Sequence, residues 1–207
     1  MAPKPFTIAI AGNPNCGKTA LFNALTGSRQ HVGNWPGVTV EKKEGFFDLG
    51  DRHIRVVDLP GTYALFANAE DERAAVDFLL TREANLIVNI VDATNIERNL
   101  FLTSQIVDMQ QPMVIAVNMM DIAEARGLNI DLEALSKRFG VPVVPLSAVS
   151  EKSITNFRDD YEEHVKNGHC LASTEGPVPC VALCPANVDI PGYIALVREG
   201  KPADEVK

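Results

Sequence analysis

A phosphate-binding motif near the start of the chain restricts its fold more than any other feature. Residues 12–19 read GNPNCGKT, which matches the pattern G-x-x-x-x-G-K-S/T, and they follow a short apolar run at 6–11. In such a loop the glycines let backbone N–H groups surround phosphate oxygens, the lysine faces the β and γ phosphates, and the last hydroxyl binds Mg²⁺. The motif therefore predicts a nucleoside triphosphate site on a loop between a strand and a helix. The predicted phosphate-binding residues are Gly12, Asn13, Pro14, Asn15, Cys16, Gly17, Lys18, Thr19 and Ala20.

Apolar runs with the length of buried strands alternate with helical patterns along the chain. The runs are rich in Val and Ile and lie at 6–11, 54–58, 86–92, 113–118 and 141–146. The helical patterns lie at about 17–26, 70–81, 96–109, 130–139 and 151–166. Strands that are apolar on both faces are typical of buried parallel sheets. The alternation therefore predicts an α/β fold, a doubly wound sheet with helices on both faces.

A more polar stretch at 41–49 adds a sixth strand to this sheet. It runs into Gly50-Asp51, a turn signal, so we expect it to pair antiparallel with the 54–58 strand at one edge. Two segments, 27–38 and 60–70, contain Gly, Asn and Pro without periodicity. We expect them to be the irregular loops in which nucleotide-sensing switches lie. The predicted architecture is a mostly parallel six-stranded sheet with one antiparallel edge strand.

Charge, hydropathy and cysteine spacing exclude several classes of protein. The net charge of the 207 residues is −8, whereas a nucleic-acid-binding surface needs clustered Lys and Arg. No stretch approaches 18 consecutive apolar residues, and the start leaves no room for a signal peptide, so we expect a cytosolic protein. The four cysteines do not form a secreted disulfide framework. We expect one domain over 1–167, followed by an irregular tail of unknown role over 168–207.

Two further motifs are placed to sense a γ-phosphate and its magnesium ion. The run DLPG at 58–61 is a D-x-x-G motif at the end of a strand, where Asp58 can hold Mg²⁺ through water and the Gly61 N–H can face the γ-phosphate. Thr39 lies between the phosphate loop and the antiparallel strand, where its hydroxyl can close over Mg²⁺ and release it when the γ-phosphate is lost. We therefore expect Thr19, Thr39 and Asp58 to bind the metal, and Lys18, Thr39 and Gly61 to act in catalysis.

A base-recognition motif favours guanine over adenine. The run NMMD places Asn118, Met119 and Asp121 after the 113–118 strand. A carboxylate at Asp121 can accept from the N1–H and the exocyclic amine of guanine, and adenine lacks this pair of donors. Ser147 and Ala148 follow the last predicted strand, where backbone N–H groups can support the guanine O6. These residues therefore predict a GTP/GDP site.

With these motifs in place, the sequence resembles a known family. GNPNCGKTALFNALTG, VGNWPGVTVEKKEG, VVDLPGTYAL and NMMD are similar to the cytosolic G domain of FeoB-type ferrous iron transporters, GTPases of the TRAFAC class, over about residues 5–165. The resemblance implies a GTP-hydrolysing switch linked to ferrous iron transport. Its movement would be relayed to a membrane permease, on a separate chain or on sequence missing from this one, at the inner face of the cell membrane.

The resemblance also implies how hydrolysis is assisted. Asn15 matches the position that helps to coordinate K⁺ beside the phosphates in potassium-activated relatives, where the cation replaces an arginine finger; simple capping of the loop by Asn15 stays open. Thr62 stands where Ras-type enzymes place a water-orienting Gln, so we expect slow unaided hydrolysis. The water would be positioned by the backbone of 33–39 or by an acid at 70–72, although those acids also suit the start of a helix.

Other residues leave alternatives open. Trp35 could touch the nucleotide or a partner, or it could pack locally. The thiol of Cys16, beside phosphates and a lysine, could be sensitive to oxidation.

In the tail, PVPCVALCP and VDIPGYI resemble ferredoxin-like iron–sulfur segments. Such a cluster needs four thiolates, and only Cys170 precedes Cys180 and Cys184, so a degraded module, a shared ligand set or a fusion junction stay open. Two alternative functions follow: a soluble ribosome- or RNA-associated GTPase, or a redox-linked iron–sulfur or interaction module that retains a nucleotide fold.

Overall fold

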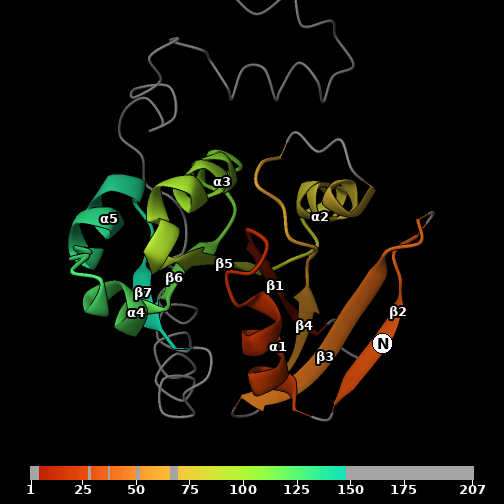
Figure 1. Ribbon diagram of the computed structural model, residues 1–207. Coiled ribbons are helices and arrows are strands. Elements are labelled where there is room, and N and C mark those ends of the chain that lie inside the picture. The colour runs from red at the N-terminus through yellow and green to blue at the C-terminus, as the bar shows by residue number, and fades with distance from the viewer. Residues whose placement is uncertain (1–4, 28, 37, 50–51, 66–69, 148–207) are drawn as a thin grey trace, which may run out of the picture.

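A twisted seven-stranded sheet with helices on both faces forms the centre of the computed structural model (Figure 1). The structure describes residues 5–27, 29–36, 38–49, 52–65 and 70–147. In these ranges the strands are β1 (Phe6–Gly12), β2 (Gln30–Asn34), β3 (Glu41–Leu49), β4 (Arg52–Asp58), β5 (Leu86–Asp92), β6 (Met113–Asn118) and β7 (Val143–Leu146). The helices are α1 (Lys18–Thr26), α2 (Glu70–Thr81), α3 (Ile96–Asp108), α4 (Met120–Ala125) and α5 (Leu132–Phe139), with a 3-10 turn, η1 (Ala93–Asn95).

The sheet is doubly wound, as predicted. Its strand order is β2-β3-β4-β1-β5-β6-β7, and β4, β1, β5, β6 and β7 pair in parallel. Among the described strands, the antiparallel pairings are β2 with β3 and β3 with β4. After β1 the chain forms the edge strand β2, returns through β3 to β4 beside β1, and then crosses to β5 on the other side of β1. The connections therefore change sides at β1, and this is the point at which such sheets bind ligands.

The edge of the sheet differs from the prediction. A seventh strand, β2, pairs its residues 30–34 with residues 41–45 of β3, so β3 lies one position inside the edge. The sequence suggested an irregular loop over 27–38 because β2 has no hydrophobic alternation: four of its five residues are exposed. A strand that is exposed on both faces gives no period-two signal. The prediction of six strands, with 41–49 at the edge, was therefore wrong.

Two hydrophobic clusters lie on opposite faces of the sheet. On β1, Ile8 and Ile10 pack with α1, whereas Ala9 and Ala11 belong to the cluster that α2 and α3 cover. Both sets are almost fully buried. Alternate residues of one strand thus enter different cores, which explains why the parallel strands are apolar on both faces.

The described helices agree with the sequence with one exception. The structure has α2 at the predicted 70–81, while the short helix α4 within the N-x-x-D region was not predicted. The helix predicted at 151–166 and the domain boundary predicted at 167 lie outside the described residues. Among the helices that the structure describes, none has the length and hydropathy needed to span a membrane.

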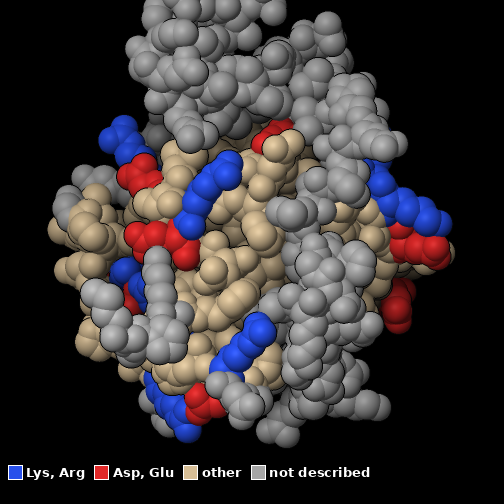
Figure 2. Space-filling model, turned by 180° about the vertical axis from the view of Figure 1, so that it is seen from behind, with Lys and Arg blue, Asp and Glu red and all other residues tan. Residues whose placement is uncertain are grey.

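Charged side chains of both signs share the surface. On the face shown in Figure 2, Lys and Arg side chains lie among Asp and Glu side chains. Exposed ion pairs such as Arg29–Asp48, at 2.5 Å, and Lys137–Glu133, at 2.9 Å, contribute little to stability. The stability of the fold is therefore concentrated in the two cores.

Candidate functional site

The predicted motifs meet at one edge of the sheet. Gly12 ends β1, Asp58 ends β4 and Asn118 ends β6, and Ser147 follows directly after β7. The parallel register pairs Ile10 with Asp58 and Asn118 with Leu146, so the carboxyl ends of these strands lie side by side (Figure 1). Motifs that are more than a hundred residues apart in the sequence therefore contribute to one site.

The phosphate loop has the backbone shape that its sequence predicts. Gly12 has a φ of 151°, and a Cβ at this position would lie 2.5 Å from the carbonyl oxygen of Ile90. Gly17, with a φ of 103°, caps the N-terminus of α1, and Asn15 adopts a φ of 64°. The start of α1 adds the backbone N–H groups of its first turn and the positive end of the helix dipole. The loop between β1 and α1 is therefore suited to an anion such as a phosphate chain.

The D-x-x-G segment packs directly on this loop. A Cβ at Gly61 would lie 2.9 Å from Cα of Pro14 and 3.0 Å from Nζ of Lys18. The N–H of Thr62 donates to the carbonyl of Gly12 at 3.3 Å, and Nζ of Lys18 donates to the carbonyl of Asn13 at 2.7 Å. The structure thus brings Gly61 and Lys18 together, as the motifs require.

The side chains of Thr19 and Asp58 fit a magnesium ion. Oγ1 of Thr19 donates to Oδ2 of Asp58 at 2.9 Å, while Oδ1 of Asp58 is buried and has no hydrogen-bond partner among the described residues. Burial raises the pKa of the Asp58 carboxyl, against the smaller effects of Thr19 and Lys18. A buried carboxylate oxygen without a partner, next to a hydroxyl, is the hard oxygen donor set that Mg²⁺ prefers. Thr39 is exposed on the segment between β2 and β3.

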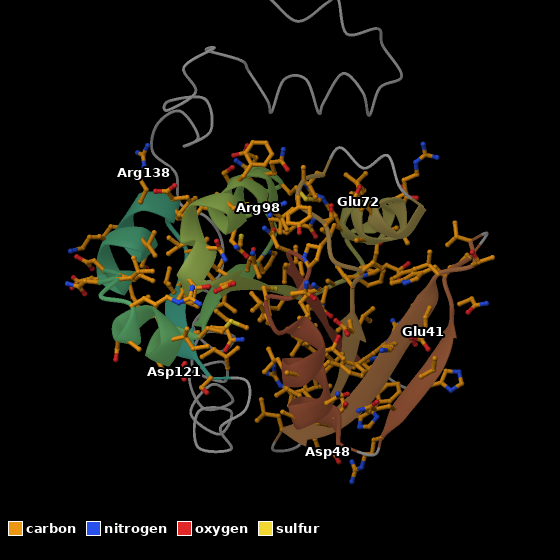
Figure 3. All side chains as sticks on the ribbon, viewed as in Figure 1. Glu41, Asp48, Glu72, Arg98, Asp121 and Arg138 are labelled. Carbon is orange, nitrogen blue, oxygen red and sulfur yellow. The ribbon has the colours of Figure 1, made fainter. Side chains whose placement is uncertain are left out.

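The base-recognition motif is tied to the phosphate loop. Nδ2 of Asn118 donates to the carbonyl of Cys16 at 3.0 Å, so this amide joins two motifs 102 residues apart. Met119 adopts a φ of 63° and caps α4, and Asp121 is exposed in the first turn of that helix (Figure 3). Ser147 is half-buried after β7, and Ala148 lies outside the described residues. The carboxylate of Asp121 is thus accessible to a planar base.

Helix α3 contributes contacts that no sequence motif indicates. The guanidinium of Arg98 lies 3.9 Å from the ring centroid of Tyr63, where α3 approaches the segment before α2 (Figure 3). Oε1 of Gln105 accepts a hydrogen bond from the N–H of Leu65 at 2.8 Å. The available signal was a glutamine between Leu102 and Ile106 on the apolar face of the predicted helix. The sequence alone does not say which group that side chain would bind.

The structure also decides several alternatives. Trp35 packs locally: its ring is buried edge-on against Phe78 of α2, with a centroid distance of 5.5 Å. Cys16 belongs to the core beneath α1, and burial raises the pKa of its thiol despite the nearby charge of Lys18. A buried thiol with a raised pKa is less reactive toward oxidants, so the expectation of oxidation sensitivity finds no support here. The acidic run at 70–72 begins α2, in agreement with the helix-start interpretation, and a role of these acids in positioning water stays a prediction.

Comparison with known proteins identifies the family. A family model described as "Ferrous iron transport protein B" matches residues 6–161. The chain belongs to the FeoB family. The Fe(2+) transporter FeoB of Salmonella typhimurium is 48% identical over 168 residues, which cover 79% of this chain and 22% of that protein. The Fe(2+) transporter FeoB of Escherichia coli K12 is 50% identical over 155 residues, which cover 73% of this chain and 20% of that protein.

Solved FeoB structures share the fold. The G domain of the T. maritima FeoB iron transporter has a TM-score of 0.72 and 41% identity, covering 78% of this chain and 99% of that one. The FeoB G domain from Methanococcus jannaschii has a TM-score of 0.69 and 45% identity, covering 79% and 99%. An N11A mutant of S. thermophilus NFeoB, bound to mGDP, has a TM-score of 0.71 and 42% identity, covering 85% and 65%. The described chain therefore has the P-loop GTPase fold of a FeoB G domain, and it spans less than a quarter of the length of the curated relatives it matches.

Proposed function

We propose that this FeoB G domain binds GTP and GDP with Mg²⁺ and hydrolyses GTP as a switch. The observation that carries the proposal is the packing of Gly61 on the phosphate loop, beside the Thr19–Asp58 pair. In this arrangement the backbone N–H groups of 12–17, the start of α1 and Lys18 would bind the phosphates. FeoB relatives whose solved structures contain mGDP or GDP support the choice of nucleotide.

Each residue of the site has a proposed role in the reaction. Thr19 and Asp58 would hold Mg²⁺, with Thr39 closing over the site, and the ion neutralises phosphate charge when bound. The Gly61 N–H would face the γ-phosphate. Water attacks the γ-phosphorus in line, the bond to the oxygen that bridges the β and γ phosphates breaks, and GDP and phosphate are released. The segments at 31–40 and 58–70 would then relax.

The guanine base would be read by the N-x-x-D motif. Asp121 would accept hydrogen bonds from the N1–H and the amine of guanine, and Asn118 would hold the base-recognition loop against Cys16. Met119, Ser147 and Ala148 complete the proposed base pocket. This assignment explains why the Asn118 amide is buried whereas the Asp121 carboxylate is exposed.

A potassium ion beside the phosphates is the finer part of the proposal. Asn15 is exposed and has a left-handed backbone conformation within the loop, which suits a side chain that reaches toward a bound ligand. We expect K⁺ held by Asn15 to neutralise charge in the transition state, as an arginine finger does elsewhere. Unaided hydrolysis should be slow because the Thr62 hydroxyl is engaged with the carbonyl of Ala64 at 2.6 Å.

The membrane setting is proposed from the family. The curated relatives are Fe(2+) transporters of which this chain spans about a fifth, so we place the domain at the inner face of the cell membrane. Changes at 31–40 and 58–70 would be relayed to a membrane permease domain or subunit. Membership of the FeoB family favours this function over the ribosome- or RNA-associated GTPase and over the iron–sulfur module.

The experiment is GTP hydrolysis by the full chain in KCl and, in parallel, in NaCl. We expect measurable phosphate release in both salts, faster release in KCl, and loss of the K⁺ effect in Asn15→Ala. Binding of GDP by Asn15→Ala serves as the control for folding. Absence of GTP binding and turnover in the wild type would refute the proposed function, whereas turnover that is equal in the two salts would refute only the role of K⁺.

A further inference from the structure

Helix α3 holds the D-x-x-G segment by its backbone. Gln105 is 0% exposed, and its Oε1 accepts a hydrogen bond from the N–H of Leu65 at 2.8 Å. A backbone N–H can only donate, so the acceptor must be the oxygen of the amide and not its nitrogen. The two residues are 40 positions apart, and the bond therefore joins two separate elements of the fold.

The chemistry of Gln105 argues against a role in packing alone. Its Nε2 is buried and has no hydrogen-bond partner among the described residues. A buried donor without a partner destabilises the fold, and an apolar side chain of similar length would avoid that cost. The position is flanked by Leu102 and Ile106, both fully buried, so an apolar residue would suit its surroundings. The hydrogen bond to Leu65 is the feature that only a side chain with an acceptor supplies.

The segment at 61–65 is fixed at both of its ends. At the first end, the N–H of Thr62 donates to the carbonyl of Gly12 at 3.3 Å, and a Cβ at Gly61 would lie only 2.9 Å from the backbone of Pro14. At the second end, the N–H of Leu65 donates to Gln105. Between them, Arg98 of α3 lies over the ring of Tyr63.

The same helix is also tied to the phosphate loop. Nδ2 of Asn13 donates to the carbonyl of Arg98 at 3.4 Å. Helix α3 thus contacts both the loop that would hold the phosphates and the segment that would sense the third one. A fixed distance between these two parts is what a γ-phosphate sensor requires.

We propose that Gln105 is a positioning residue for GTP hydrolysis. By accepting from the Leu65 N–H, it holds the Gly61 backbone at the position where it meets the γ-phosphate. This inference rests on the proposed function. If the 61–65 segment loses its bond to Gln105, the affinity for GTP and the rate of GTP hydrolysis decrease. The affinity for GDP does not change, because GDP lacks the γ-phosphate that the segment faces.

The test compares three variants of the full chain. Gln105→Met removes the acceptor and keeps the length of the side chain. Gln105→Glu restores it, because a carboxyl oxygen accepts from an N–H in either protonation state. Ser104→Ala is the matched control: Ser104 is the neighbouring residue, 5% exposed, and its Oγ donates to the carbonyl of Phe101 within α3 at 2.7 Å.

For each variant, affinities for GDP and for a non-hydrolysable GTP analogue are measured, together with kcat and the unfolding temperature. We expect Gln105→Met to lose about 3- to 10-fold in analogue affinity and in kcat, the range of one neutral hydrogen bond, while GDP affinity stays within about twofold. Gln105→Glu should recover most of the loss, and Ser104→Ala should behave as the wild type.

Two results would overturn the inference while the proposed function stands. In the first, the wild type hydrolyses GTP, and Gln105→Met has the same analogue affinity and the same kcat as Ser104→Ala. The other is an equal loss of GDP and analogue affinity, which indicates general destabilisation. If Gln105→Met does not fold, hydrogen exchange of the Leu65 amide in the wild type decides: protection that increases with the GTP analogue relative to GDP supports the inference, and no increase refutes it.

Discussion

The close approach of Gly61 to the phosphate loop predicts a large effect of a single methyl group. In Gly61→Ala the new Cβ would lie 2.9 Å from both Cα and N of Pro14, where ordinary contact begins at 3.4 Å. The Lys18 amine, 3.0 Å away, can swing aside, but the Pro14 backbone is held between β1 and α1. The segment at 61–65 must therefore move. Overpacking of this kind costs about 1–3 kcal/mol, which for a domain of this size lowers the unfolding temperature by about 2–12 °C.

The chain supplies a matched stability control for this variant. Gly33 lies on β2, and nothing lies within 4 Å of the position that a methyl group would take there, so Gly33→Ala adds the same group without a clash. A glycine in a strand is about 0.5–1 kcal/mol less favourable than alanine, and we expect Gly33→Ala to unfold at an equal or higher temperature. Thermal unfolding of both variants, followed by circular dichroism, measures the difference.

Nucleotide affinities show which part of the site moves in Gly61→Ala. Because Gly61 is proposed to face the γ-phosphate, Gly61→Ala should lose about 5- to 150-fold in affinity for a non-hydrolysable GTP analogue, the range that follows from about 1–3 kcal/mol, and much less for GDP. A Gly61→Ala variant with the unfolding temperature and analogue affinity of the wild type would show that the segment does not pack on the loop as described. Equal loss of GDP binding would place the displacement in the phosphate loop instead.

Two further predictions concern base selection and pH. Asp121→Ala should reduce the preference for GTP over ATP by about 100-fold or more, measured by competition against labelled GDP; unchanged competition by ATP would refute the base assignment. Burial alone would raise the pKa of the Glu44 carboxyl, but hydrogen bonds from Lys42 and Arg55 outweigh it, so the pKa lies below its ordinary 4.5. A lowered pKa in the folded state stabilises the fold at pH values above 4.5, and this contribution is lost as the pH falls and the carboxyl becomes protonated. Denaturant unfolding should therefore show that Glu44→Gln loses less stability below pH 4.5 than the wild type does. An equal dependence of the unfolding free energy on pH in the two proteins would contradict the pairing.

Much of this fold could be predicted because its information is local. The parallel strands are apolar on both faces, and residues such as Ile8 and Ala9 show why: neighbouring positions enter different cores. The phosphate loop, D-x-x-G and N-x-x-D are short motifs at strand ends, so the topology of a doubly wound sheet brings them together without further information. Strand β2 was not predicted because four of its five residues are exposed, so its sequence carries no hydrophobic alternation that would indicate pairing with β3.

The contacts that connect the site to the rest of the domain could not be predicted, and the reason is physical. Trp35, on the segment after β2, packs against Phe78 of α2, and the N–H of Leu65, on the segment after β4, donates to Gln105 of α3. Each pair joins residues 40 or more positions apart, and neither Phe78 nor Gln105 lies in a motif of the sequence. A motif specifies groups that touch a ligand, whose chemistry is fixed, whereas a packing partner is specified only by the shape of the folded core. The sequence therefore indicates where GTP would be sensed, and the tertiary structure shows that the two segments proposed for this role contact α2 and α3, the helices that cover one face of the sheet.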